Sequence, residues 1–332
     1  MSKKVAINGF GRIGRLTFRN LMKIDGVEVV AINDLTDNAT LAHLLKYDSA
    51  QGPFEGTVSS TDEHLIVNGN KIICSAERNP AALPWKQMGV DVVLECTGIF
   101  TSADKAGLHI EAGAKDVIIS APAKGDGVQT IVLGVNDHEL KKDHHIFSNA
   151  SCTTNCLSPL AKIIQENFNI QVGSMTTTHA YTSDQNIQDS PHKDLRRSRA
   201  AAFNIVPTST GAASATGKVV PNISGKLSAI AVRVPVITGS MVELNVVVEK
   251  ATTAEEVNSL FKAAADGPMK GILEYSTDPL VSSDIMRNPH SSIFDSLMTE
   301  VNGTFVKVVS WYDNEAGYSA RLADLTMRVL NR

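Results

Sequence analysis

The sequence predicts an α/β fold in two parts: a doubly wound parallel sheet first, then an α+β region with a mixed or antiparallel sheet. Short apolar runs alternate with segments of helical periodicity up to about residue 120, a pattern typical of parallel sheets. After about residue 150, long strand-like segments dominate, which favours an α+β arrangement. The length of 332 residues suits two domains.

The elements of the first part follow from hydrophobic spacing. We expect strands at 5–7, 27–32, 91–96 and 117–120, and helices at 13–24 and 103–112. Asn68-Gly69-Asn70 separates the two strand-like segments 65–67 and 71–73. This turn signal predicts an inserted hairpin.

The second part begins with a helix at 151–168, for which Ser151 is a suitable N-cap. We expect strands at 172–178, 227–236, 241–248 and 305–311, and a closing helix at 315–330. The turn at 237–240 predicts that the strands on either side of it pair antiparallel. Asn302-Gly303 predicts another hairpin.

Composition excludes several classes of protein. An apolar fraction of 43% with 20% charged residues is typical of a folded chain, and a net charge of -4 argues against nucleic acid as the primary partner. The four cysteines are too few for a disulfide scaffold and indicate a reducing, cytoplasmic location. We expect no signal peptide and no membrane span, because the N-terminus reads directly into a strand and no run of 18 apolar residues exists.

A dinucleotide-binding motif lies at the start of the chain. Gly9, Gly11 and Gly14 form Gly-x-Gly-x-x-Gly between a predicted strand and helix, the context of a Rossmann-type domain. Asp34 follows the third glycine by 20 residues, the spacing of the acid that binds the adenosine ribose. That carboxylate would repel a 2′-phosphate, so NAD is favoured over NADP. The alternatives are a glycine-rich turn without a ligand and an Asp34 that serves only as a turn residue.

Cys152 is the candidate nucleophile. It lies in the first turn of the helix at 151–168, where unpaired N–H groups and the helix dipole favour a thiolate. Cys156 lies one turn deeper and is expected to be a core thiol. We expect no metal site, because the two cysteines lack a second pair of ligands at short spacing.

Candidate partners for that thiol follow in the sequence. His179 ends a polar strand, so it is a candidate base. The basic run 193–199 precedes Pro207-Thr208-Ser209-Thr210-Gly211, and hydroxyls, glycine and arginine together suit a phosphate. A solvated basic face is the alternative. Arg233 is isolated in an apolar strand, so it either binds an anion or faces solvent.

Four motifs together resemble those of the phosphorylating glyceraldehyde-3-phosphate dehydrogenases. They are Asn8-Gly9-Phe10-Gly11-Arg12-Ile13-Gly14-Arg15, Ala150-Ser151-Cys152-Thr153-Thr154-Asn155-Cys156, Pro207-Thr208-Ser209-Thr210-Gly211-Ala212-Ala213 and Trp311-Tyr312-Asp313-Asn314-Glu315. The resemblance covers essentially the whole chain. Asp34 together with Pro191 resembles the NAD-specific members of the family.

The resemblance implies a role for each matching residue. Cys152 would be the nucleophile and His179 the acid and base. Inorganic phosphate would be bound by Ser151, Thr153, Thr210 and Gly211, and the substrate's own phosphate by Thr182, Arg197 and Arg233. The cofactor would contact Gly9, Gly11, Arg12, Ile13, Gly14, Asp34, Arg78, Ser120 and Asn314.

The resemblance also implies the reaction and the domains. Glyceraldehyde 3-phosphate, NAD and inorganic phosphate would give 1,3-bisphosphoglycerate through a thioester in glycolysis, in a cytoplasmic homotetramer. The NAD-binding domain would span residues 1–150 joined by the helix at 315–332, and the catalytic domain residues 151–314. The alternatives are erythrose-4-phosphate dehydrogenase, aspartate-semialdehyde dehydrogenase, which the Cys-Thr-Thr-Asn-Cys context disfavours, and a cofactor-binding protein that serves mainly in interactions such as RNA binding.

Overall fold

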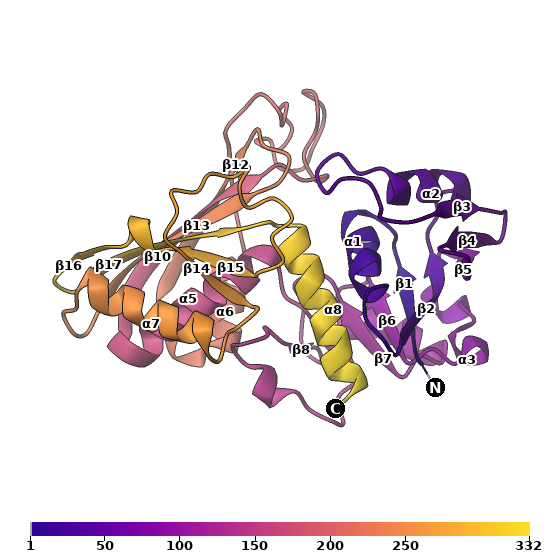
Figure 1. The fold of residues 1–332 in the computed structure, drawn as a ribbon, viewed down its shortest axis with the longest axis horizontal. Coiled ribbons are helices and arrows are strands. Elements are labelled where there is room, and N and C mark those ends of the chain that lie inside the picture. Colours follow the sequence, from indigo (N-terminus) through magenta and orange to yellow (C-terminus); the bar gives the residue numbers. More distant parts are fainter. Residues whose placement is uncertain (1) are drawn as a thin grey trace. The chain divides into compact units, whose positions relative to one another are not determined.

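The computed structural model describes residues 2–332, which form two compact units (Figure 1). The first unit contains the chain up to Ile131 together with 138–150 and 319–332, and the second contains 132–137 and 151–318. The C-terminal helix α8 (Ala316–Leu330) therefore gives most of its residues to the first unit. Among residues 2–332, no helix combines the length and the apolarity that crossing a lipid bilayer requires.

The sheet of the first unit has nine strands. Their spatial order is β3 (Val58–Ser60), β4 (His64–Val67), β5 (Asn70–Ser75), β2 (Val27–Asn33), β1 (Lys3–Asn8), β6 (Val92–Glu95), β7 (Asp116–Ile119), β9 (Ile146–Ser148) and β8 (Gln129–Thr130). All neighbours from β5 to β8 pair parallel, which confirms the predicted doubly wound sheet. The pair β4–β5 is antiparallel, which confirms the hairpin at Asn68-Gly69-Asn70.

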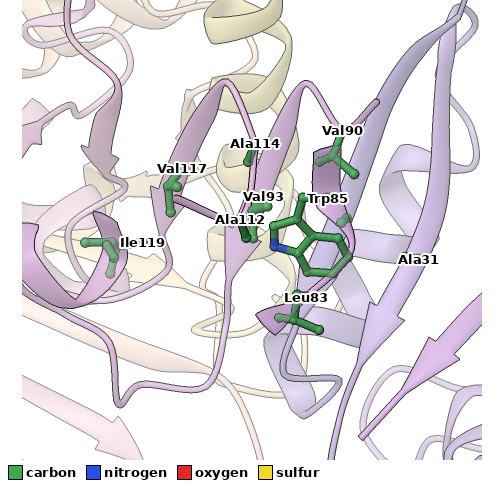
Figure 2. Close-up of a cluster of buried hydrophobic side chains, with 11 residues drawn as sticks. Ala31, Leu83, Trp85, Val90, Val93, Ala112, Ala114, Val117 and Ile119 are labelled. Carbon is green, nitrogen blue, oxygen red and sulfur yellow. The ribbon is translucent and has the colours of Figure 1, made fainter. Parts of the chain in front are cut away.

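Helices connect the parallel strands of this unit. They are α1 (Arg12–Leu21), α2 (Asn38–Lys46), α3 (Trp85–Met88) and α4 (Ala103–Glu111), with the short 3₁₀ helices η1 (Pro80–Ala82) and η2 (Asp137–Glu139). Figure 2 shows the indole of Trp85 among apolar side chains from neighbouring strands and loops, including Leu83, Val90 and Val93. Trp85 is fully buried, so this cluster anchors the short helix α3 against the sheet.

The sheet of the second unit is mixed, as the sequence predicts. Seven strands lie in the order β11 (Val206–Thr208), β12 (Leu227–Val234), β10 (Ile170–Ala180), β13 (Ser240–Val248), β17 (Phe305–Tyr312), β15 (Ser292–Asp295) and β14 (Leu273–Ser276), and β16 (Glu300–Asn302) pairs with β17. The β16–β17 pair is the hairpin predicted at Asn302-Gly303.

One predicted strand pairing is wrong. The strands on either side of the turn at 237–240, β12 and β13, are not neighbours. Instead β10 lies between them, parallel to β12 and antiparallel to β13. A four-residue turn signal fixes only where the chain reverses, whereas β10 can satisfy the backbone hydrogen-bonding groups of both strands along its length. This insertion places His179 of β10 directly beside Arg233 of β12.

Four helices complete the second unit and its C-terminal connection. They are α5 (Cys152–Phe168), α6 (Ala212–Val219), α7 (Ala254–Asp266) and α8, with the 3₁₀ helices η3 (Pro221–Ile223) and η4 (Ser296–Met298). Helix α5 packs on α6, α7 and several strands of the sheet (Figure 1). Its side chains are largely buried, Cys156 among them, as the core-thiol prediction requires. The helix itself begins at Cys152, with Ser151 as N-cap.

Candidate active site

The glycine loop between β1 and α1 has a different constraint at each glycine. Gly9 has φ +91°, and a Cβ there would lie 2.7 Å from the amide nitrogen of Thr97. A Cβ on Gly14 would lie 2.2 Å from the carbonyl oxygen of Gly9, whereas one on Gly11 would meet no atom within 4 Å. Gly9 and Gly14 therefore allow tight packing, and Gly11 leaves open space for a ligand to approach the backbone.

Helix α1 begins directly after this loop with no side chain capping its N-terminus. Uncapped N–H groups at a helix N-terminus attract phosphate oxygens. The open space at Gly11 lies at the same point, because Gly11 is the N-cap residue. The loop thus fits the pyrophosphate of a dinucleotide.

Asp34 lies next to the loop, at the end of β2. Its carboxylate accepts hydrogen bonds from the backbone N–H groups of Phe10, at 2.7 Å, and Thr36, at 3.0 Å. Asp34 also lines a cavity of about 600 Å³, together with residues such as Ser60 and Ser75. The carboxylate is therefore held at a depression beside the glycine loop, where a ribose can reach it.

The other cofactor residues of the first unit differ in their surroundings. Arg12 is half-buried and forms an ion pair with Asp48. Ile13 and Ser120 are half-buried, and Arg78 is exposed in the segment that follows β5. Their side chains are therefore less restrained than the glycine loop itself.

In the second unit, Cys152 and His179 form a close pair. Cys152 is the first residue of α5, and His179 lies near the end of β10. The distance from Sγ of Cys152 to Nε2 of His179 is 3.4 Å. Nδ1 of His179 lies 2.7 Å from the carbonyl oxygen of Ala180, which fixes the ring. A thiol and an imidazole in this contact can exchange a proton.

The electrostatic environment of the pair differs from the prediction. Burial raises the pKa of the Cys152 thiol, although the charge of Arg233 and a hydrogen bond from Thr153 oppose that effect. Burial and the neighbouring Arg233 charge lower the pKa of His179 to about 3. Burial therefore favours the neutral form of each group and opposes the effect of the helix N-terminus, which favours a thiolate. Desolvation disfavours both charged forms.

Arg233 contacts the imidazole of His179 on the side away from Cys152. Its Nη1 lies 2.8 Å from Nδ1 of His179 and donates to the carbonyl oxygen of Ala180, at 3.1 Å, and to the hydroxyl of Thr182, at 3.0 Å. The residue is half-buried, and none of these three partners carries a negative charge. A half-buried guanidinium with neutral partners suits an anionic ligand.

A second arginine joins the same cluster through Asp184. Arg197 forms an ion pair with Asp184 at 2.6 Å and donates to the hydroxyl of Thr208 at 2.8 Å. Asp184 also accepts a hydrogen bond from Thr182. Burial raises the pKa of Asp184, but Thr182 and the two arginines outweigh it, so the pKa is lowered overall. The structure thus links Thr182, Arg197 and Arg233 in one network.

Two hydroxyl groups flank the nucleophile. The Ser151 hydroxyl accepts from the N–H of Thr154 at 3.1 Å, so the N-cap also orients the start of α5. The Thr153 hydroxyl is 2.9 Å from that of Tyr312, which is 2.8 Å from the hydroxyl of Thr177. The ring of Tyr312 packs edge-on against His179. Tyr312 therefore holds both the residue after Cys152 and the imidazole.

The remaining predicted residues lie at other points of the second unit. Thr210 and Gly211 precede α6, and Gly211 is its N-cap without a side-chain cap. The side-chain oxygen of Asn314 accepts from the backbone N–H of Gly239, at 3.2 Å, and from the hydroxyl of Ser240, at 3.0 Å. These bonds orient the Asn314 amide, with its NH₂ group left to donate.

Sequence reasoning missed several residues that build the site. Asp184 joins the two arginines, and Thr177 and Tyr312 support Cys152 and His179. Asp313 accepts from the N–H groups of Glu315 and Ala316 and so begins α8. Tyr312 and Asp313 stand beside Asn314 in one motif, which was an available signal. Asp184 and Thr177 had none.

A glycine loop suited to a dinucleotide and a close thiol–imidazole pair in one chain fit the class of NAD-dependent oxidoreductases. Family models agree with this class. Residues 3–103 match the NAD-binding domain of glyceraldehyde 3-phosphate dehydrogenase, and residues 151–314 match its C-terminal domain. The chain belongs to the glyceraldehyde-3-phosphate dehydrogenase family, which confirms the predicted family and the cofactor NAD.

Curated relatives match over nearly the full length. Proteins named glyceraldehyde-3-phosphate dehydrogenase from Mycolicibacterium smegmatis, Geobacillus stearothermophilus and Thermotoga maritima are 57%, 56% and 58% identical to this chain. The alignments cover 99%, 100% and 97% of this chain and 99%, 99% and 97% of the relatives. The alternative of erythrose-4-phosphate dehydrogenase is not favoured.

Proposed function

We propose that this protein oxidises glyceraldehyde 3-phosphate with NAD and inorganic phosphate to 1,3-bisphosphoglycerate. The observation that carries the proposal is the 3.4 Å contact between Sγ of Cys152 and Nε2 of His179. The relatives of this chain are also named after that substrate. A cysteine nucleophile with an adjacent base splits aldehyde oxidation into two easier steps.

The first step forms a bond between sulfur and the aldehyde carbon. As Sγ of Cys152 attacks, its proton passes to Nε2 of His179 and on to the former carbonyl oxygen, giving a hemithioacetal. With the ring proton of His179 on Nδ1, which lies 2.7 Å from the acceptor oxygen of Ala180, the lone pair of Nε2 faces sulfur. A neutral imidazole is the form that can accept this proton.

The second step makes a thioester. Bound NAD supplies the hydride acceptor, and its pyrophosphate fits the loop at Gly11 and the uncapped N-terminus of α1. His179 takes the hydroxyl proton as the hydride leaves, and the carbon remains bonded to sulfur. Phosphate oxygen then attacks that carbon, the carbon–sulfur bond breaks, and Cys152 leaves as thiolate, which recovers a proton from His179.

Two anion sites support this chemistry. Thr182, Arg197 and Arg233, which share one hydrogen-bond network, would hold the phosphate of the substrate. Ser151, Thr153, Thr210 and Gly211 would hold inorganic phosphate, through hydroxyls and the uncapped N-terminus of α6. A phosphate on Arg233 would also offset the positive charge that lowers the pKa of His179.

The remaining assignments concern NAD and the molecular context. Gly9, Gly11, Arg12, Ile13, Gly14, Asp34, Arg78, Ser120 and Asn314 would contact NAD. We propose a homotetramer as the active form. Exposed apolar side chains support an interface between subunits, and four of them, Ile187, Leu195, Phe203 and Ile205, are all at least 69% exposed in one segment. The free cysteines are consistent with a glycolytic enzyme of the cytoplasm.

The test follows NADH formation at 340 nm with glyceraldehyde 3-phosphate, with and without inorganic phosphate. We expect fast turnover that requires phosphate. Cys152→Ser is expected to lower kcat at least ~10³-fold while still binding NAD, because a hydroxyl has too high a pKa to be the nucleophile. The matched control is Cys156→Ser, because the buried thiol of Cys156 lies against the hydroxyl of Ser292 and the carbonyl oxygen of Ser310. Turnover independent of phosphate, or near-normal turnover of Cys152→Ser, would contradict the proposal.

A further inference from the structure

A buried polar network lies beneath the glycine loop of the first unit. Its centre is Glu95, the last residue of β6, which is 1% exposed. Asn8 at the end of β1 and His109 on α4 surround it, at 2% and 0% exposure. None of these three residues has a role in the site described above. A glutamate is rarely buried so completely unless its carboxylate is paired.

Every contact of the Glu95 carboxylate is with a hydrogen-bond donor. Its Oε2 accepts from the amide of Asn8, at 2.5 Å, and lies 2.9 Å from Nε2 of His109. Its Oε1 accepts from the backbone N–H of Thr97, at 2.8 Å, and from the hydroxyl of the same residue. Each of the two carboxylate oxygens therefore acts as an acceptor for two neighbouring groups.

Trp85 fixes the protonation of His109. The indole nitrogen of Trp85 can only donate, and it lies 3.0 Å from Nδ1 of His109. Nδ1 therefore carries no proton, so His109 is neutral and its Nε2–H points at Glu95. Figure 2 shows the indole of Trp85 packed among Leu83, Val90 and other apolar side chains, which restrict its rotation.

The network reaches the loop at both sides of Gly9. Asn8 precedes Gly9 in the chain, and the Thr97 nitrogen would lie 2.7 Å from a Cβ at Gly9. Glu95 accepts hydrogen bonds from the side-chain amide of Asn8 and from the backbone N–H of Thr97. One buried carboxylate thus ties the residue before Gly9 to the backbone against which Gly9 packs.

The same network continues from Asn8 to the end of β2 and to the segment that follows β5. The side-chain oxygen of Asn8 accepts from the amide of Asn33 at 2.7 Å. The side-chain oxygen of Asn33 in turn accepts from the N–H of Glu77 at 2.8 Å. Glu77 precedes Arg78 in the segment after β5, so the network also anchors the backbone next to that arginine.

We infer that Glu95, with its tautomer-fixed partner His109, is a positioning residue for NAD: it ties Asn8, the residue before Gly9, to the Thr97 backbone against which Gly9 packs, so that the loop fits the pyrophosphate. The inference rests on the binding of NAD by this unit and is independent of the reaction that follows. Removing the charge should relax the loop and weaken NAD binding, because fewer loop molecules then have the binding geometry.

The primary variant is Glu95→Gln, which keeps the shape but replaces one acceptor oxygen by a donor NH₂ group. In either orientation of the new side chain, its NH₂ group faces at least one of the donors that the carboxylate had accepted from, so that donor loses its acceptor. We expect the dissociation constant for NAD, from isothermal titration calorimetry, to rise at least about tenfold. The KM for NAD should rise in parallel, while kcat at saturating NAD stays within about threefold and the KM for glyceraldehyde 3-phosphate is unchanged.

Asp116→Asn is the matched control. Asp116 is another buried carboxylate of the same sheet, bound by Arg332 and His145, but it lies at the start of β7 and so at the edge away from the loop. This variant should lower the melting temperature without changing the NAD dissociation constant. If both variants weaken NAD binding equally, Glu95 acts only through overall stability and the inference is wrong.

A milder variant covers the case in which Glu95→Gln does not fold. Trp85→Phe keeps an aromatic ring in the apolar cluster but removes the N–H group that fixes His109. We expect a two- to fivefold rise in the NAD dissociation constant. A folded Glu95→Gln or Trp85→Phe protein that binds NAD like the parent would overturn the inference. Loss of aldehyde oxidation by a parent protein that still binds NAD would count against the proposed function alone.

Discussion

Gly9 and Gly11 lie two residues apart in one loop, yet replacing each by alanine should affect different properties. At Gly9 the backbone has φ +91°, and a Cβ would lie 2.7 Å from the nitrogen of Thr97 and 2.8 Å from the carbonyl carbon of Cys96. Both colliding atoms belong to the backbone, so they cannot rotate away. At Gly11 the Cβ position is open.

The cost of Gly9→Ala has two parts. A non-glycine residue in a left-handed conformation costs about 1–3 kcal/mol, and forcing extra volume into a packed site costs about 1–3 kcal/mol more. The free energy of unfolding should therefore fall by about 2–6 kcal/mol, which lowers the melting temperature by on the order of 10 °C. Gly11→Ala should change the free energy of unfolding by less than about 1 kcal/mol.

Gly11→Ala should have little effect on stability but a large effect on the binding of NAD. Its added methyl group would fill the space through which the pyrophosphate approaches the backbone, so we expect the NAD dissociation constant to rise at least about tenfold, or about 1.4 kcal/mol. Scanning calorimetry and titration calorimetry on the same two variants measure both quantities. A Gly11→Ala protein with unchanged NAD affinity, or a Gly9→Ala protein as stable as the parent, would refute this reasoning.

Two further predictions concern the second unit. Arg233→Gln removes a positive charge that lowers the pKa of both Cys152 and His179. The pH midpoint for alkylation of Cys152 by iodoacetamide should therefore shift to higher pH. A midpoint that is unchanged or shifts to lower pH would show that this charge is not felt at the thiol. Tyr312→Phe removes a hydroxyl that bonds two buried threonines, so it should lower the free energy of unfolding in urea by about 1–3 kcal/mol. An equally stable variant would mean that the two threonines re-pair without it.

Local patterns in the sequence predicted the parts of the fold that depend on neighbouring residues. The glycine spacing predicted the loop after β1, and the alternation of strands and helices predicted the parallel sheet. Ser151 caps α5 and Cys152 begins it, as the sequence indicated. Helix caps, turns and hydrophobic periodicity act over a few residues, so they can be read from a single sequence.

Longer-range features were beyond such patterns. The turn at 237–240 predicted a hairpin, but β10 lies between the two strands and so brings His179 into register with Arg233. The helix N-terminus predicted a thiolate at Cys152, whereas burial raises the pKa of that thiol. Desolvation depends on every atom packed around a group, and no local pattern records it.

Glu95 illustrates the same division at the NAD site. The sequence shows one acidic residue at the end of an apolar strand, next to Cys96, and predicts no role for it. The tertiary structure surrounds its carboxylate with donors from Asn8, Thr97 and His109, which lie up to 87 residues away in the chain. The sequence by itself determined the loop that faces NAD, and the folded sheet decided which buried charge holds that loop in place, because hydrogen bonds between distant segments exist only once the strands have paired.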